Sequence, residues 1–216
     1  MSEPSRNLLH RLAHPTTQER KFDSVLMSPT VQYLFELLKW LTPSQWIIHK
    51  SRGKSWPIEV YVIAVTAALV AALLLANDHD RRGAAEWAQA GAVVIAWWRW
   101  AEILAVGLEL AIGRVRMQAS SAIVAWGIFL FQATLIFAII AEVQARNGFK
   151  FPDGHPGGAL DYFYVSWTNL ATLGNSVAPI TGRAELIVVL TGLTGLVLIG
   201  IILTYAMKGG DASQSE

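Results

Sequence analysis

Apolar residues fill four long stretches of the chain, and shorter polar segments separate them. The stretches cover about residues 57–76, 87–113, 121–143 and 185–207. A helix of about 20 predominantly apolar residues crosses the roughly 30 Å hydrocarbon core of a bilayer, so each stretch is long enough to span it. The pattern therefore predicts an all-α membrane protein with four transmembrane helices.

A shorter helical pattern lies between the third and fourth predicted spans. A loop rich in glycine and proline covers residues 144–159, and such residues disfavour regular structure. Residues 160–171 then read as a short helix with Asp161 near its start, and the chain is expected to leave helical geometry at Gly174 before it meets Pro179. We therefore expect a re-entrant helix and loop, because non-helical backbone at membrane depth is tolerated where it lines water or is enclosed by protein.

Composition agrees with a membrane protein and excludes several chemistries. Of the 216 residues, 53% are hydrophobic and 15% are charged. The chain has no cysteine, which excludes disulfides, thiolate metal sites and cysteine nucleophiles. The net charge of +1 gives no reason to expect a nucleic-acid partner, and no catalytic constellation is apparent within the spans, so we expect no enzyme.

The distribution of lysine and arginine predicts the orientation of the spans. Cytoplasmic segments carry an excess of these residues. If the spans alternate in direction, eleven basic residues lie on the side of the termini and five on the other side. The eleven are Arg6, Arg11, Arg20, Lys21, Lys39, Lys50, Arg52, Lys54, Arg114, Arg116 and Lys208, and the five are Arg81, Arg82, Arg146, Lys150 and Arg183. We therefore expect a multi-pass protein of the cell membrane with both termini in the cytoplasm.

The polar segment after the short helix has the residue types of an ion-selectivity filter. We assign that role to Thr172, Leu173, Gly174, Asn175 and Ser176. Backbone carbonyls along such a segment replace the hydration shell of an ion when several copies face one axis. Gly174 adopts dihedrals that other residues avoid, and the carbonyl end of the preceding helix favours a cation. Thr172 and Leu173 are the positions expected to bind transient monovalent cations.

These residues resemble the pore module of a known family. Trp167 to Gly174, the Pro179-Ile180-Thr181 exit, Arg183, and an inner helix with Gly192 and Gly195 are similar to tetrameric cation channels of the potassium-channel type. The resemblance covers about residues 121–207. It implies an outer helix, a pore helix with Trp167 and Thr168, a filter and an inner helix. It also implies a homotetramer around one pore, with K⁺ or Na⁺ as the permeant ion and no bound cofactor.

The filter departs from the potassium-selective pattern, and the departures set the expected selectivity. That pattern reads Thr-Val-Gly-Tyr-Gly-Asp, whereas Asn175, Ser176 and Val177 follow Gly174 here. Thr172 to Pro179 covers eight residues, the length of the non-selective filters of cyclic-nucleotide-gated channels. We therefore expect a channel that conducts monovalent cations with weak selectivity. A potassium-selective channel, or a non-conducting receptor or transporter subunit that uses the module as a scaffold, remains an alternative.

The pattern along the chain, together with the resemblance over 121–207, divides the chain into five parts. We expect a flexible cytoplasmic N-terminus at 1–28, an interfacial amphipathic helix and linker at 29–56, a peripheral two-helix transmembrane layer at 57–120, the pore module at 121–207 and a cytoplasmic tail at 208–216. The amphipathic helix either lies among lipid headgroups or packs against the cytoplasmic ends of the bundle. Both interpretations stay open at this point.

The fourth span carries candidate moving parts. Gly192 and Gly195 form a hinge for gating, or they let neighbouring helices approach closely. Ile199, Leu203 and Met207 recur at four-residue steps, so they form either a gate that closes by dewetting or a stripe that faces lipid or another subunit.

Charged residues within the spans also need an explanation. Arg99 lies near the middle of the second span, where an arginine costs about 2.5–3.5 kcal/mol on insertion scales. Glu102 follows three residues later on the same helical face, so the two form a neutralised pair that faces protein, or they take part in voltage or lipid sensing. Neighbouring tryptophans pack against the bundle or stack on the guanidinium. Glu142, at the outer end of the third span, attracts cations or pairs with Arg146.

Overall fold

The computed structural model describes residues 43–44, 47, 56–76, 84–112, 119–152, 157–174 and 176–212. The expected loose segment 1–28, most of the expected amphipathic helix and linker at 29–56, and the last four residues of the tail lie outside the described residues. The two compact units of the chain divide after Leu41. The fold described below belongs to the second unit.

Four long helices form at the four predicted apolar stretches. They are α5 (Trp56–Ala76), α6 (Ala84–Ile112), α7 (Ala119–Ala145) and α9 (Gly182–Ala212). All four are long and apolar enough to cross a membrane, so the prediction of an all-α, multi-pass membrane protein is confirmed. The helix α9 continues five residues beyond the predicted boundary at 207, because backbone hydrogen bonding continues after the apolar side chains end.

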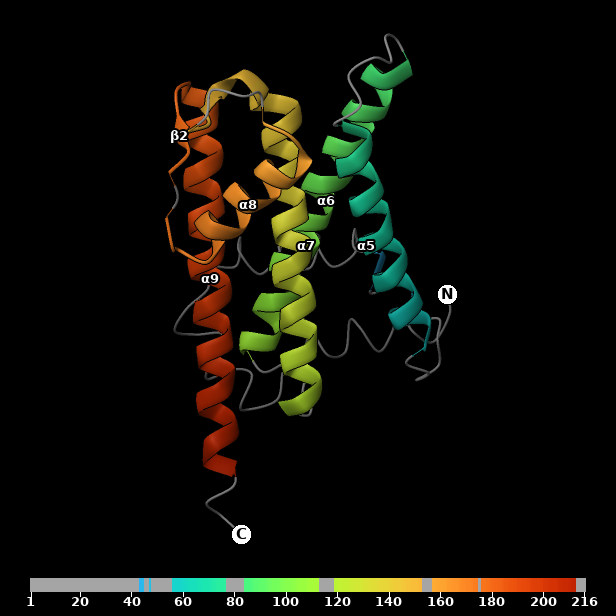
Figure 1. Ribbon diagram of the computed structural model, residues 1–216. Coiled ribbons are helices and arrows are strands. Elements are labelled where there is room, and N and C mark those ends of the chain that lie inside the picture. The colour runs from blue at the N-terminus through green and yellow to red at the C-terminus, as the bar shows by residue number, and fades with distance from the viewer. Residues whose placement is uncertain are drawn as a thin grey trace, which may run out of the picture. The chain divides into compact units, whose positions relative to one another are not determined.

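The connection between α7 and α9 contains several short elements. A single 3-10 turn, η1 (Arg146–Gly148), leads into β1 (Phe149–Lys150), then α8 (Ala159–Leu170) and β2 (Ala178–Pro179). The predicted short helix is confirmed as α8. The strands were not predicted: β1 and β2 pair antiparallel, and the Ile180 amide donates a 2.7 Å hydrogen bond to the Gly148 carbonyl. The chain therefore leaves α7 and re-joins α9 at the same end of the bundle, with α8 between (Figure 1).

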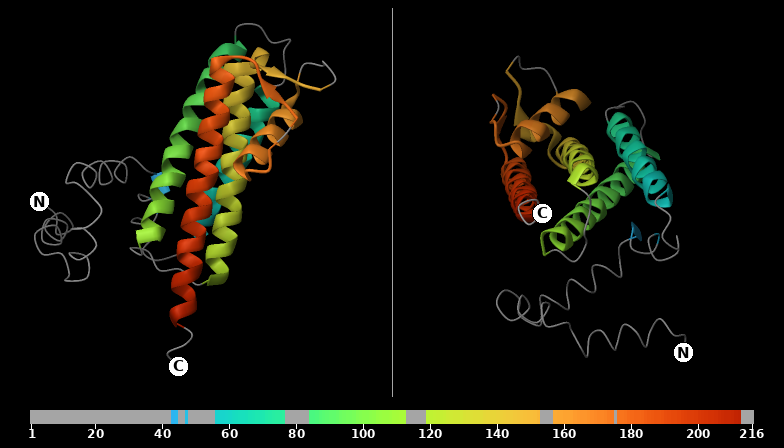
Figure 2. Two further views of the ribbon diagram at one scale, coloured as in Figure 1. Left: turned by 90° about the vertical axis from the view of Figure 1, so that its left-hand side faces the viewer. Right: turned by 90° about the horizontal axis from the view of Figure 1, so that it is seen from below.

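The helix α7 is the centre of this unit. Every residue from Gln132 to Glu142 is buried, and the helix packs against α5, α6, α8 and α9 (Figure 2). About 61% of its apolar span is buried inside the chain, against 11% for α5. This difference makes α7 the interior helix and leaves most of α5 facing its surroundings.

A buried ion pair within α6 is hydrogen-bonded to α7. Arg99 and Glu102 are 4% and 1% exposed, and the Arg99 Nη1 donates to the Glu102 Oε2. The Nε and Nη2 of Arg99 donate to the Gln132 Oε1 on α7, at 2.9 and 2.7 Å. The guanidinium also lies 5.5 Å from the centre of the Tyr61 ring, so this tyrosine stacks on it. The pair is thus neutralised and faces protein, as one of the two interpretations of the sequence expected.

The same network extends to α5 and to the residues before it. The Tyr61 hydroxyl donates to the Glu102 Oε2 at 2.8 Å, and the Ser44 amide donates to the Oε1 at 3.1 Å. The Gln132 Nε2 donates to the Thr66 hydroxyl at 2.6 Å. Side chains of three helices therefore satisfy one another where the helices meet.

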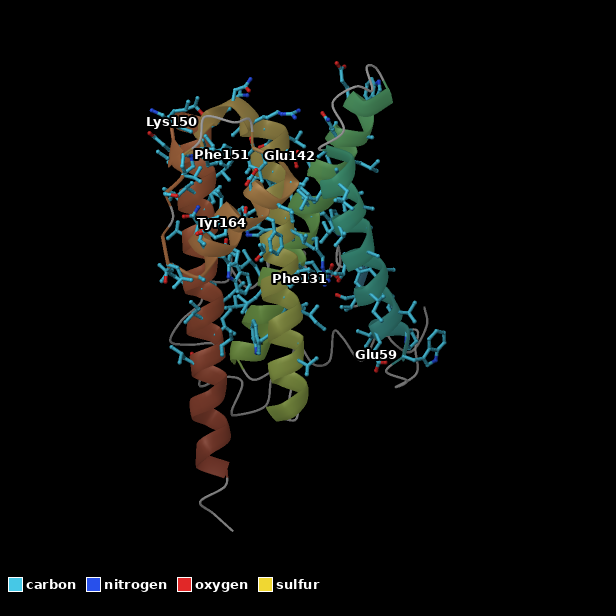
Figure 3. All side chains as sticks on the ribbon, viewed as in Figure 1. Glu59, Phe131, Glu142, Lys150, Phe151 and Tyr164 are labelled. Atoms are coloured by element: carbon cyan, nitrogen blue, oxygen red, sulfur yellow. The ribbon has the colours of Figure 1, made fainter. Side chains whose placement is uncertain are left out.

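Glu142 is buried like Glu102, but its carboxylate lacks the hydrogen bonds that Glu102 accepts. Its side chain is 1% exposed on α7, next to the start of α8 (Figure 3), and neither carboxylate oxygen accepts a hydrogen bond from a described residue. Arg146 lies close enough for its charge to act on this carboxyl group. Glu142 and Arg146 therefore interact through their charges, and no described residue donates a hydrogen bond to the Glu142 carboxylate.

Two matched substitutions separate these buried glutamates. Glu102→Gln removes the counter-charge of a buried arginine, and we expect it to lower the free energy of unfolding by about 3–5 kcal/mol. Glu142→Gln removes a buried charge whose oxygens accept no hydrogen bond from a described residue, so stability is expected to stay unchanged or rise by about 1 kcal/mol. Thermal melting followed by circular dichroism in one detergent measures both. Equal losses in the two variants would contradict the difference in their environments.

Candidate functional site

The start of α8 is fixed to the turn η1 that follows α7. The Asp161 Oδ2 accepts a 2.8 Å hydrogen bond from the Gly158 amide, which satisfies a helix terminus and places a carboxylate at the positive end of the helix. The Tyr162 hydroxyl donates to the Arg146 carbonyl at 2.7 Å, and its ring meets Phe149 and Phe151 edge-on. Burial raises the pKa of Tyr162 to about 12, so the hydroxyl remains a donor at neutral pH.

The end of α8 turns the chain through a Schellman motif. The Leu173 amide donates to the Thr168 carbonyl at 2.9 Å, and the Thr172 amide donates to the Asn169 carbonyl at 3.1 Å. Thr172 occupies the left-handed position with a φ of +57°, where glycine is usual. A left-handed conformation costs an L-residue roughly 1–2 kcal/mol. The chain therefore leaves helical geometry at Thr172, two residues before the predicted position, because these hydrogen bonds offset the strain.

The predicted filter residues lie on the surface of the single chain. Thr172, Leu173, Gly174 and Ser176 are exposed, and Leu173 is 73% exposed. Gly174 has a φ of +71°, and no described atom lies within 4 Å of the position that a Cβ would take there. The remaining predicted filter residue, Asn175, lies outside the described residues. The segment therefore presents backbone and hydroxyl oxygens without close packing around Gly174.

The two residues assigned to the pore helix lie in the last turns of α8 and face different ways. The Thr168 hydroxyl is buried and donates to the Tyr164 carbonyl of its own helix at 2.9 Å. The Trp167 side chain is 42% exposed. Together with Leu160 and Tyr164, Trp167 forms an exposed apolar face of α8, since these residues follow one another at four- and three-residue steps. The four- and three-residue spacing of these three residues in the sequence was a signal from which this face could have been predicted.

The helix α9 supports the end of α8 through a glycine. A Cβ at Gly195 would lie 1.9 Å from the Leu170 carbonyl oxygen, so only glycine permits this approach of the two helices. No described atom lies within 4 Å of a Cβ at Gly192. The two glycines, which the sequence did not distinguish, therefore differ: Gly195 is a site of close packing, and Gly192 has free space around it. The Leu170 carbonyl consequently faces α9.

The candidate gate residues follow further along α9. Ile199 and Leu203 are 36% and 57% exposed, on the same side of the helix. Met207 belongs to α9, although its side chain lies outside the described part of the chain. An apolar face of α9 is exposed as well, formed by Leu186, Val189, Leu193 and Leu196.

Within the described residues, no three histidine, aspartate or glutamate side chains gather into a group that could hold a metal ion. The oxygen atoms after α8 that could coordinate a cation are backbone carbonyls and the hydroxyls of Thr172 and Ser176. No protein-family model, curated protein or solved structure matches this chain. The resemblance to tetrameric cation channels consequently rests on the residues of the chain itself.

Alanine substitutions at the two glycines test the packing of α8 on α9. We expect Gly195→Ala to lower the melting temperature, because a Cβ there collides with backbone and forces the helices apart. Gly192→Ala is the matched control. It meets no atom and is expected to be neutral or to stabilise α9 by up to about 1 kcal/mol through helix propensity. If Gly195→Ala melts at the wild-type temperature, the close approach is not a constraint in solution.

Proposed function

We propose that this protein is a channel that conducts monovalent cations, and that four copies surround one central pore. Ions would cross at residues 172–176. The single observation that carries the proposal is the geometry between α7 and α9. A helix of only 12 residues ends partway along two spanning helices, and the segment after it returns the chain, through β2, to the end at which it entered (Figure 1). A helix of that length is about 18 Å long, too short to cross the membrane.

The backbone after α8 supports this function through its exposure. The amides of Thr172 and Leu173 are bonded to α8, but the segment to Gly174 lies on the surface of the chain. Irregular backbone facing hydrocarbon is strongly disfavoured, so at membrane depth such a segment needs water or another protein chain beside it. A water-filled axis shared by several copies supplies both.

The dihedral angles of the segment suit carbonyl coordination. The φ angle is positive at Thr172 and Gly174 but not at Leu173. A change of hand at successive residues rotates the peptide planes, so neighbouring carbonyls need not point to opposite sides as they do in a regular strand. Carbonyls of several copies arranged in this way around one axis would replace the water around a dehydrated cation.

The exposed apolar faces support assembly into a ring. Leu160, Tyr164 and Trp167 on α8 are uncovered beside the exposed segment, and so is the apolar face of α9. A closed ring is built from two different surfaces of each subunit that meet around the axis. The faces of α8 and α9 lie on the part of the chain that would surround the pore, so neighbouring subunits would cover them. Ile199, Leu203 and Met207 would then line or border the cavity on the side of the C-terminus.

The proposed conductance is weakly selective, with both termini in the cytoplasm. The segment has one glycine where potassium-selective filters have two, and it lacks their tyrosine. Fewer carbonyls can then align in a row, which leaves the sites near Thr172 and Leu173 and reduces discrimination between K⁺ and Na⁺.

Substitution of Gly174 tests the proposed pathway. Gly174→Val places a β-branched residue at a φ of +71°, so the backbone must rearrange there. We expect single-channel currents in planar bilayers to disappear while cross-linking still detects the tetramer. Gly182→Val is the matched control, since Gly182 is exposed, its φ is not positive and no described atom lies near its Cβ position. Wild-type conductance in Gly174→Val, or no conductance in the wild type, contradicts the proposal.

Reversal potentials test the selectivity separately. With K⁺ on one side of the bilayer and Na⁺ on the other at equal concentration, we expect the current to reverse near 0 mV for the weakly selective filter. A reversal far from that value, in the direction of the potassium gradient, would show instead that the alternative of a potassium-selective channel is correct.

A further inference from the structure

Glu142 is a buried acidic residue that lacks a hydrogen-bonding partner among the described residues. It lies in the last turn of α7 and is 1% exposed, and neither carboxylate oxygen accepts a hydrogen bond. Taking a carboxylate out of water without a replacement hydrogen bond costs free energy, because the protein does not restore its solvation. Binding a proton removes this cost, since it neutralises the group.

Dense packing surrounds the last turn of α7. Tyr162 of α8 is 0% exposed, and the rings of Phe149 and Phe151 meet it edge-on, with 5.9 and 5.6 Å between ring centres. A Cβ at Gly148 would lie 2.5 Å from the Thr181 hydroxyl oxygen, so η1 also approaches the start of α9 closely. This packing separates the carboxyl group from bulk water.

The charged groups at this end of the bundle come from several elements. Arg146 of η1 follows Glu142 by one turn, and its positive charge acts on the Glu142 carboxyl group. The facing helix α8 contributes Asp161, whose carboxylate accepts from the Gly158 amide, and Tyr162, on which the charge of Glu142 acts. Four further charged residues are exposed, namely Lys150 of β1, Arg183 and Glu185 at the start of α9, and Glu86 near the start of α6, while α5 has no charged residue after Glu59.

The polar surface begins within one turn of the buried carboxyl group. Gln144 and Asn147 are exposed, and Arg146 is half-buried. Gln144 follows Glu142 by two residues, a rise of about 3 Å along the helix. Helix ends open locally at a lower free energy than the middle of a bundle. A proton therefore reaches Glu142 through a small opening at the end of α7.

The neutral carboxyl group can make a hydrogen bond that the ion cannot, because protonation adds one O–H donor. Buried hydroxyl groups of this chain donate to a carbonyl one turn earlier in their own helix. The Thr134 hydroxyl donates to the Leu130 carbonyl at 2.9 Å on α7, and the Thr191 hydroxyl donates to the Ile187 carbonyl at 2.7 Å on α9. A helix carbonyl has two lone pairs, so acceptors of this kind are present along α7. Protonated Glu142 can therefore be satisfied where the ion is not.

The start of α8 lies beside Glu142 (Figure 3) and is attached to η1 by the hydrogen bond from the Tyr162 hydroxyl to the Arg146 carbonyl, at 2.7 Å. If this attachment opens, water reaches the carboxyl group. Hydration favours the ion strongly and the neutral group weakly. The start of α8 therefore detaches more readily when Glu142 is ionised, and the attached state binds the proton more tightly than the detached state.

We propose that Glu142 is a proton-binding site, and that a proton bound there keeps the start of α8 attached to η1. Neither step depends on conduction. An ordered water molecule is the competing occupant, because it would hydrogen-bond the carboxylate and leave it charged. The two occupants differ in whether the attachment of α8 responds to pH.

Hydrogen exchange of the full chain in liposomes, measured over a series of pH values and corrected for the intrinsic exchange rate at each pH, tests the proposal. In the wild type we expect the amides of η1 and of the first turns of α8 to become better protected as the pH falls. The limit for one linked proton is about tenfold per pH unit. Glu142→Gln is expected to lose this response. The matched control Glu86→Gln removes an exposed carboxylate of α6 and is expected to keep it.

Infrared difference spectroscopy detects the proton directly. On acidification of the wild type we expect the C=O stretching band of a protonated carboxyl group, and we expect Glu142→Gln to lack the part of this band that Glu142 contributes. If Glu142→Gln does not fold, Glu142→Leu removes the same group and gives the same two readouts.

Three results would overturn the proposal. Wild-type protection that does not change with pH favours the water molecule. A pH response that Glu142→Gln retains belongs to another group, and its loss in Asp161→Asn would identify Asp161. Identical infrared bands in the wild type and Glu142→Gln show that Glu142 takes up no proton. Gly174→Val, which tests the proposed channel, is expected to keep the wild-type pH response, so a failure of the channel proposal leaves this one standing.

Discussion

The structure depends on one constraint: a polar group that enters a hydrocarbon layer must find its partner inside the protein. Arg99 meets this constraint through Glu102 and Gln132, and the hydrogen bonds that complete the network come from α5 and from Ser44. Because each member satisfies the others, the network also fixes how three helices lie against one another. Interhelical hydrogen bonds of this kind replace the hydrophobic driving force, which is weak between helices that are already in lipid.

The same constraint shapes the end of α8. The last carbonyls of this helix would be unsatisfied, and the amides of Thr172 and Leu173 turn back to bond two of them. A threonine accepts a left-handed conformation to make this possible. The turn exposes the segment that follows. In this way the requirement for satisfied backbone leads from a short helix to the exposed oxygens on which the proposed ion pathway rests.

The two proposals place different roles on the two ends of α8. At its last turn α8 packs on α9 through Gly195, and the exposed apolar faces of the two helices would meet neighbouring subunits around a pore. At its start α8 is bonded to η1 through Tyr162 and lies beside the buried Glu142. Phe131 and Phe163 connect the two helices, because their rings pack 5.9 Å apart between α7 and α8. Conduction, selectivity, the tetramer and the proton site remain proposals that the experiments above decide.

The sequence by itself determined the four spans and α8, because apolar length and helical periodicity are local properties that one segment carries alone. It also placed Arg99 and Glu102 on one face. Only the tertiary structure decided that Gln132 and Tyr61 complete their network, that Gly195 and not Gly192 is the close contact, that Glu142 accepts no hydrogen bond from a described residue, and that β1 pairs with β2. These facts depend on which residues meet across segments far apart in the chain, and hydropathy and spacing carry no information about such meetings.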